Sequence, residues 1–314
     1  MSRLVPTVCF VVAVAAGAAV AEVPRVSTDI APVHSLVSRV MQGVAEPDLI
    51  VAPGASPHEY SLRPSEAAAL QDANIVFWIG PDLTPWMVGA LDTLSADATV
   101  IPLLNHDQTE RLSFRENAIF EADGHDDHDA HASDDHGHSH AEGASDPHAW
   151  LSPKNAGVWL DVIATTLAET DPENAALYLS NAKEGQAELA TMIAEIEGIL
   201  TPAKGGMFVV FHDAYQYFEN AFDLPSAGAI NLSDASDPSP ARIADIQAHI
   251  AEHDITCVLS EPQFDPGLVR AVSGDSGARV AVLDPLGSDL QPGASLYPMM
   301  LQNLAQSLAE CFGG

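Results

Sequence analysis

Short apolar runs alternate with helix-patterned segments along most of this chain, and the alternation occurs in two separate series. The apolar runs have the length and the bounding turn residues of buried strands, and the segments between them carry apolar residues at helical spacing. Strand, helix and strand in this order predict a parallel sheet with right-handed crossovers. The sequence therefore predicts two α/β lobes. The predicted strands are residues 25–32, 48–54, 74–80 and 99–103 in the first series and 207–215, 226–230, 255–263 and 278–287 in the second.

A long helical segment lies between the two series. Apolar residues recur at helical spacing over 155–168, and a second pattern opens with Asp171 as its predicted N-cap and Pro172 at the first helical position. At 1.5 Å per residue this second helix is roughly 40 Å long, which is enough to reach across two lobes. We therefore expect an N-terminal lobe, a linking helix and a C-terminal lobe at residues 22–170, 171–201 and 202–314.

The first 21 residues have the pattern of a secretory signal peptide. A positive charge precedes an apolar run at residues 4–18, and the small residues after it predict cleavage near Ala21. An uncleaved membrane anchor is the alternative, and the alanine-rich run that ends in a cleavage pattern argues against it. Export places the mature chain in an oxidising compartment, where Cys257 and Cys311 are an even pair and predict one disulfide.

The charge balance excludes some classes of partner. The chain has 12 Lys and Arg residues against 44 Asp and Glu residues, a formal net charge of -32. Such a charge repels nucleic-acid phosphates and anionic lipid surfaces, so we expect no nucleic-acid partner. It raises the local concentration of cations without selecting among them.

One polar segment, residues 124–143, reads GHDDHDAHASDDHGHSHAEG. It buries too little surface to offset the entropy of ordering it, so we expect a flexible His/Asp-rich loop over residues 121–146. Neutral imidazole and carboxylate both bind divalent metals, and such tracts are typical of metal binding. A solvated acidic linker is the alternative. The candidate auxiliary ligands are His125, His128, His131, His136, His138 and His140.

Four further side chains lie where a strand pattern ends and a loop begins, which is where open α/β sheets place their ligand sites. Taken singly, each is more often a capping or core residue, and it is the combination that indicates a site. Three imidazoles and one carboxylate make a tetrahedral ligand set that suits zinc. The four residues are His58, His148, His212 and Asp284.

Four motifs contain these residues: GASPHEYSLRPS, DPHAWLSP, FHDAY and LDPLG, in this order. On these motifs the chain resembles, over essentially its whole mature length, the cluster A-I solute-binding proteins of metal-uptake ABC transporters, and among them the zinc-binding members. The resemblance implies two (β/α) lobes bridged by a rigid long helix, with the metal held between the lobes. It implies that His58, His148 and His212 are ligands, and that Asp284 or a water completes the shell.

The resemblance also bears on the choice of metal. Manganese and iron relatives typically carry Glu at the position of His212, and nitrogen donors favour zinc over those harder ions. A His/Asp-rich insertion before the second ligand is likewise typical of the zinc members. Some relatives place a carboxylate directly before the first histidine, whereas this chain has Pro57 there, so the fourth ligand is open.

The predicted function is capture of zinc in the periplasm by a monomeric binding protein that is not an enzyme, and delivery of the ion to an inner-membrane ABC permease. A manganese- or iron-binding protein of the same fold is one alternative. A secreted zinc hydrolase is another, because three histidines and a water also form a catalytic set, with Glu59 or Asp213 as a candidate base. The chain has no HExxH, GxSxG or phosphate-loop motif that would favour a hydrolase.

Overall fold

The structure of the protein is a computed structural model that describes residues 22–115, 117, 119–120, 145–231, 238–264, 266–274 and 276–313. The predicted signal peptide and the six candidate histidines of the His/Asp-rich segment lie outside the described residues. None of the helices in the described ranges is both long enough and apolar enough to cross a membrane.

The N-terminal lobe is built on a four-stranded parallel sheet with the strand order β2-β1-β3-β4. All four residues of its central strand β3 are buried, as expected for a parallel sheet covered on both faces. The strands are β1 (Val26–Thr28), β2 (Asp48–Leu49), β3 (Ile75–Trp78) and β4 (Thr99–Pro102), and the helices are α1 (Ala31–Val40), α2 (Pro64–Asp72) and α3 (Met87–Leu94).

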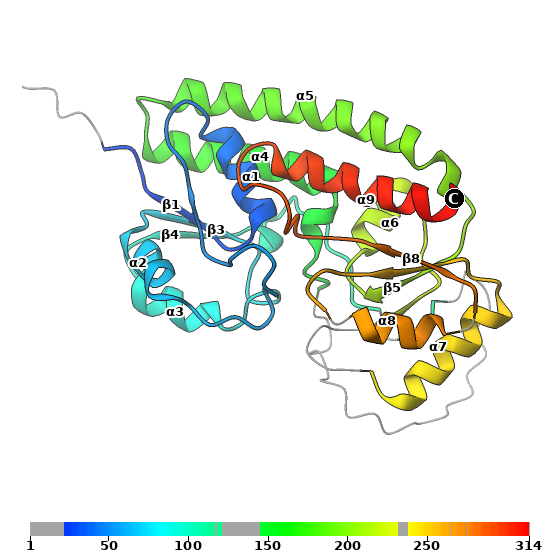
Figure 1. Ribbon diagram of the computed structural model, residues 1–314. Helices are drawn as coiled ribbons and strands as arrows, with labels where there is room; N and C mark the ends of the chain where they lie inside the picture. Colours follow the sequence, from blue (N-terminus) through cyan, green and yellow to red (C-terminus); the bar gives the residue numbers. More distant parts are fainter. Residues whose placement is uncertain are drawn as a thin grey trace, which may run out of the picture.

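The C-terminal lobe repeats this plan with the strand order β6-β5-β7-β8, again all parallel. The predicted class of two α/β lobes is therefore confirmed, and both sheets are visible in Figure 1. The strands are β5 (Phe208–His212), β6 (Gly228–Asn231), β7 (Cys257–Ser260) and β8 (Arg279–Val282), and the helices are α6 (Gln216–Phe222), α7 (Pro240–Glu252), α8 (Pro266–Ser273) and α9 (Leu296–Gly313).

Two long helices, α4 (Pro153–Thr170) and α5 (Ala175–Ile199), connect the lobes, and α5 extends over both of them (Figure 1). The prediction that Asp171 caps the long helix is wrong. Pro172 to Asn174 form a turn, and the Asp171 carboxylate accepts hydrogen bonds from the Asn174 amide and the Tyr178 hydroxyl. The division of the chain at residues 170 and 201 stays a prediction. The buried residues of α5 recur at helical spacing: Tyr178, Asn181, Ala182, Gly185, Leu189, Met192 and Ile196.

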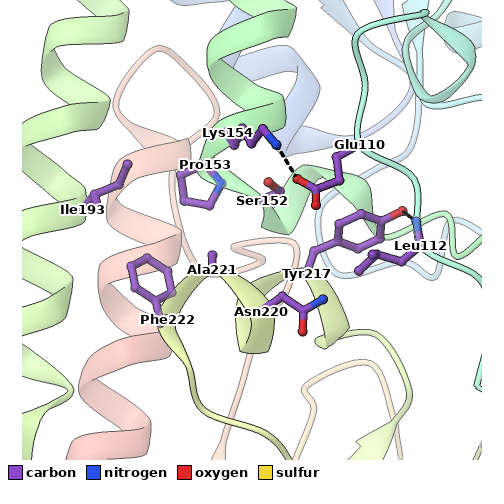
Figure 2. Close-up of a pocket in the computed structure, with 10 residues that line it drawn as sticks. All are labelled: Glu110, Leu112, Ser152, Pro153, Lys154, Ile193, Tyr217, Asn220, Ala221 and Phe222. Atoms are coloured by element: carbon purple, nitrogen blue, oxygen red, sulfur yellow. Dashed lines mark hydrogen bonds and ion pairs between the residues drawn. The ribbon is translucent and has the colours of Figure 1, made fainter.

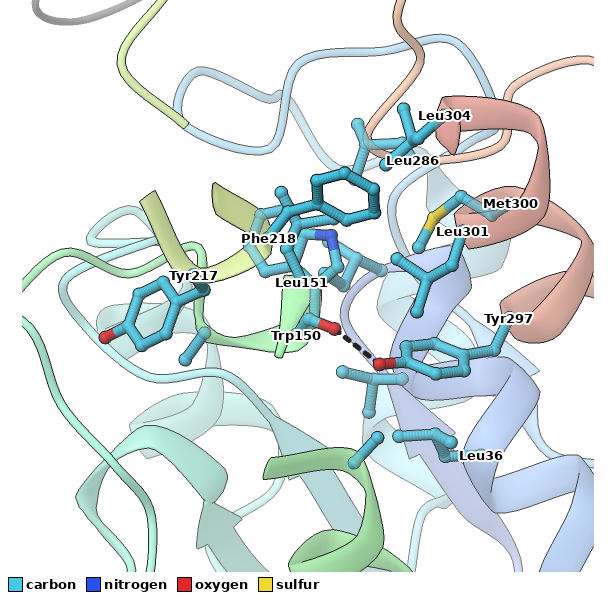
Figure 3. Close-up of a cluster of buried hydrophobic side chains, with 14 of the residues drawn as sticks. Leu36, Trp150, Leu151, Tyr217, Phe218, Leu286, Tyr297, Met300, Leu301 and Leu304 are labelled. Carbon is cyan, nitrogen blue, oxygen red and sulfur yellow. Dashed lines mark hydrogen bonds between the residues drawn. The ribbon is translucent and has the colours of Figure 1, made fainter. Parts of the chain in front are cut away.

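One hydrophobic core contains residues of both lobes, and Figure 3 shows Trp150 and Leu151 among them. Trp150 lies in the short 3-10 helix η2 (Ala149–Leu151), and its indole N–H donates to the carbonyl of Pro285 at 2.8 Å. The hydroxyl of Tyr297, on α9, donates to the carbonyl of Trp150 at 2.8 Å. These contacts tie a segment that carries one candidate ligand to the loop that follows β8 and to α9.

The predicted disulfide is confirmed. Cys257, the first residue of β7, is bonded to Cys311 near the end of α9, with their Cα atoms 6.0 Å apart. The bond fixes the last helix to a central strand of the C-terminal sheet.

Candidate metal centre

Three histidines from distant parts of the chain converge on one point between the lobes. The Nε2 atom of His148 lies 3.3 Å from Nε2 of His58 and 3.3 Å from Nε2 of His212. These three residues form a group with metal-ligand spacing among the described residues, and the structure thus brings together the three histidines predicted from sequence.

The spacing of the nitrogens suits a tetrahedral ion. Zinc is bound by imidazole nitrogen at about 2.0–2.1 Å, and two such ligands in a tetrahedral shell lie about 3.3 Å apart. The cavity that the three rings line has a volume of about 20 Å³, which is room for one ion or one water. Trp150 and Phe264 form apolar walls of the same cavity.

Each histidine is positioned by a different local structure. His212 is the last residue of β5, and His148 directly precedes η2. His58 lies in the loop between β2 and α2, where the indole N–H of Trp86 donates to the carbonyl of Pro57 at 2.8 Å and holds the preceding residue. His148 and His212 are 4% and 5% exposed, whereas His58 is half-buried, so the ring of His58 forms the open side of the group.

Two buried carboxylates orient two of the rings. Nδ1 of His148 lies 2.7 Å from Oδ1 of Asp146, and Nδ1 of His212 lies 2.7 Å from Oε1 of Glu261. In each pair the imidazole donates its Nδ1 proton to the carboxylate, which leaves the Nε2 lone pair directed at the other histidines. This is the arrangement in which metal-binding histidines are usually held.

A third buried carboxylate, Asp213, has a different partner. It forms an ion pair with Arg115, whose guanidinium also pairs with Glu219 at 2.9 Å and stacks on the ring of Phe120. Burial raises the pKa of Asp213 to about 6, and the charge of Arg115 opposes this rise. Burial likewise raises the pKa of Asp146 to about 7. A cation held by the neighbouring imidazole would favour the charged form of Asp146.

Asp284 is not part of the histidine group. Its carboxylate oxygens accept hydrogen bonds from the backbone N–H groups of Leu286 and Gly287 at 3.1 Å, and from the side-chain amide of Gln263 at 3.2 Å. In the LDPLG motif this aspartate therefore acts as a turn residue, a common role for Asp.

Sequence reasoning missed the roles of Asp146 and Glu261. Both had a visible signal, because Asp146 stands two residues before His148 in the DPH motif and Glu261 directly follows the strand that ends at Ser260. Of the two carboxylates singled out instead, Glu59 is exposed and Asp213 is paired with Arg115.

A larger cavity of about 300 Å³ lies near the start of α4, beside α5 and α6 (Figure 2). Its charged residues, Lys154 and Glu110, pair with each other at 3.0 Å, and the other residues that line it offer no imidazole or thiolate. It has no donor set for a transition metal.

Known proteins resemble the chain over most of its length. The profile of the family described as "Zinc-uptake complex component A periplasmic" matches residues 26–311. The high-affinity zinc uptake system protein ZnuA of Brucella abortus (strain 2308) is 42% identical over 303 residues, which cover 91% of each chain.

Solved structures show the same fold. A crystal structure of ZnuA superposes with a TM-score of 0.74 at 24% identity, covering 92% of this chain and 99% of that one. The solute-binding protein FpvC of Pseudomonas aeruginosa, solved in complex with Mn2+, superposes with a TM-score of 0.75 at 20% identity, covering 93% and 99%. The match over residues 26–311 and the 42% identity show that this chain belongs to the family of periplasmic zinc-uptake complex component A proteins.

Proposed function

We propose that this protein binds one zinc ion in the periplasm through His58, His148 and His212 and delivers it to the permease of a zinc-uptake ABC transporter. The observation that supports this most strongly is the 3.3 Å distance from Nε2 of His148 to Nε2 of each of the other two histidines, which matches two edges of a tetrahedral zinc shell. The zinc-uptake name of the family and of its Brucella relative points to the same ion.

The choice of zinc over manganese or iron rests on the donor set, because the fold itself does not select the metal. A protein of similar fold was solved with Mn2+. Three neutral imidazoles favour zinc, whereas manganese prefers carboxylate and water oxygens. Because Asp284 is engaged by backbone N–H groups, we propose a water as the fourth ligand.

Export and delivery complete the proposal. Removal of residues 1–21 as a signal peptide would leave a monomeric chain in the periplasm, in keeping with the periplasmic description of the family. A hydrolytic role has less support, since Glu59 is exposed and Asp213 is bound by Arg115, so neither is placed as a general base.

A competition titration tests the proposal. Chelator-stripped full chain is titrated with zinc and, separately, with manganese in the presence of a chromophoric chelator. We expect one tight zinc equivalent, much weaker manganese binding, and a loss of zinc affinity of more than about 100-fold in His148→Ala, since this change removes a ligand and not only its support. His106→Ala, a histidine outside the cluster, is the control. Manganese binding as tight as zinc would favour the alternative metal, and unchanged affinity in His148→Ala would reject the site.

A further inference from the structure

A second pair of histidines lies at the C-terminal end of α7, apart from the metal centre. His249 is in the last turn of the helix and His253 is its C-cap, so the two are separated by four residues. Residues at this spacing lie on one face of a helix, one turn apart. Their ring centroids are 4.4 Å apart with an angle of 47° between the planes. Two histidines at this helical spacing are a known zinc-binding arrangement.

The surroundings of His249 favour the neutral form of its ring, which is the form that binds a metal. The side chain is buried, and its Nε2 atom has no hydrogen-bond partner among the described residues. Burial lowers the pKa of His249 and outweighs the opposing influence of the nearby Ala227 backbone, which keeps the ring neutral.

An unpaired nitrogen of this kind calls for an explanation. A buried polar atom without a partner destabilises the folded state, so native structures seldom leave one without a compensating role. A bound cation would supply the partner that Nε2 of His249 lacks.

The surroundings favour a cation. The carbonyl end of α7 carries the negative end of the helix dipole, and the exposed carboxylates of Glu252 and Asp254 flank His253. Glu252 acts electrostatically on His249. His253 is anchored through its backbone N–H, which donates to the carbonyl of His249 at 3.1 Å, and its exposed side chain lies beside the ring of His249.

The pair is separate from the three-histidine centre. Ala227 directly precedes β6, whereas His212 pairs with Asn231 at the other end of that strand. A strand of this length spans roughly 10 Å, so no ion reaches both groups.

We propose that His249 and His253 form a second, weaker site for a borderline divalent transition metal such as zinc, nickel or copper. Nε2 of His249 and one ring nitrogen of His253 bind the ion, and Glu252 and water occupy other positions. The proposal does not depend on the three-histidine centre or on transport. A site with two imidazoles is expected to bind nickel and copper and to reject manganese.

Isothermal titration calorimetry with nickel chloride tests the second site. The sample is the full chain, loaded with one equivalent of zinc, with the six histidines of the His/Asp-rich segment replaced by Gln. We expect one nickel ion per chain, with affinity lowered more than about tenfold in His253→Gln and unchanged in the control His106→Gln. Manganese chloride should give no comparable heat.

The test remains decisive if one variant folds poorly. His253 is exposed, so His253→Gln does not disturb the core, and in the otherwise unaltered chain it should lower the number of bound nickel ions by one. His249→Gln, with folding checked by circular dichroism, should have the same effect. Equal nickel binding by His253→Gln and the parent, or no nickel bound beyond the zinc centre, would mean that the two rings only pack against each other.

Discussion

At the scale of single residues, Asp146 and Glu261 position the metal-binding rings. Each carboxylate lies 2.7 Å from Nδ1 of one histidine. Removing either carboxylate leaves the ring free to turn and makes its nitrogen less basic. We predict that Asp146→Ala and Glu261→Ala each weaken zinc binding about 10- to 100-fold, while Asp146→Asn, which keeps an oxygen acceptor, loses less. Competition titration measures this, with the exposed Glu59→Gln as control. Wild-type affinity in both alanine variants would show that the carboxylates do not support the site.

His34 gives a prediction about stability and pH. Its side chain is buried in α1, and Nε2 donates to the carbonyl of Pro47 at 3.0 Å. Burial lowers its pKa, so below about pH 6.5 the unfolded chain takes up a proton that the folded chain does not. Stability contributed by neutral His34 is therefore present above this pH and lost as the pH falls through it.

Urea unfolding of metal-free protein at pH 7.5 and 5.5 measures this effect. We expect the free energy of unfolding to fall more on acidification in the parent chain than in His34→Gln, because Gln does not titrate. An equal drop in both proteins would show that His34 does not contribute.

The three histidines could be predicted from sequence because each stands in a short motif at the end of a strand or beside a turn. The geometry around the three histidines could not be predicted from sequence. Whether Asp284 faces the ion or caps its own turn depends on the path of residues 285–288, and no local pattern distinguishes the two. Asp146 and Asp213 each stand within two residues of a predicted ligand, yet only Asp146 contacts a ring, since Arg115 holds Asp213.

At the scale of elements, the close contact of α4 and α5 depends on Gly185. A Cβ atom there would lie 3.1 Å from Cδ1 of Leu160 and 3.3 Å from Cγ of Arg39. We predict that Gly185→Leu lowers the free energy of unfolding by about 1–3 kcal/mol through overpacking. Gly198→Leu is the matched control, because a Cβ there meets nothing within 4 Å and the same change only improves helix propensity. Equal stability of the two variants in urea unfolding would contradict the packing argument.

The type and order of the elements could be predicted, because strand and helix patterns differ in period and Gly and Pro separate them. The predicted strands are too long, since residues 25–32 are predicted as one strand whereas β1 covers Val26–Thr28 and α1 begins at Ala31. The start of α5 could not be predicted from sequence. Asp171 followed by Pro172 has the local signature of an N-cap, but the Asp171 carboxylate is bound by Tyr178 and the helix begins at Ala175. A contact within the folded chain thus overrides the local preference for a helix that starts at Asp171.

At the scale of the whole molecule, the described residues that follow the His/Asp-rich segment lie beside the metal centre, because Asp146 contacts the ring of His148. The backbone N–H of Asp146 donates to the carbonyl of Leu112 at 2.8 Å. The hydroxyl of Tyr217 accepts a hydrogen bond from the backbone N–H of Leu112 and donates one to the carbonyl of Asp146. In the proposed site, three histidines and a water form the tight shell without any residue of the segment. We predict that replacing its six histidines by Gln leaves tight zinc binding unchanged and removes weaker, strongly pH-dependent sites, since exposed imidazole has a pKa of about 6.5.

Calorimetry of the parent chain and the six-Gln variant at pH 7.5 and 6.0 separates these two phases. Loss of the tight phase in the six-Gln variant would show that the segment supplies a primary ligand. An unchanged number of bound zinc ions would show that it binds none.

The central claim is that three imidazoles from the two lobes hold one zinc ion, and X-ray absorption at the zinc K edge tests it most directly. The full chain is loaded with less than one equivalent of zinc, so that only the tightest site fills. We predict three imidazole nitrogens and one further light ligand at about 2.0–2.1 Å, with one imidazole lost in His212→Ala and none lost in the six-Gln variant. A shell that is unchanged in His212→Ala, or that loses its imidazoles in the six-Gln variant, would contradict the account.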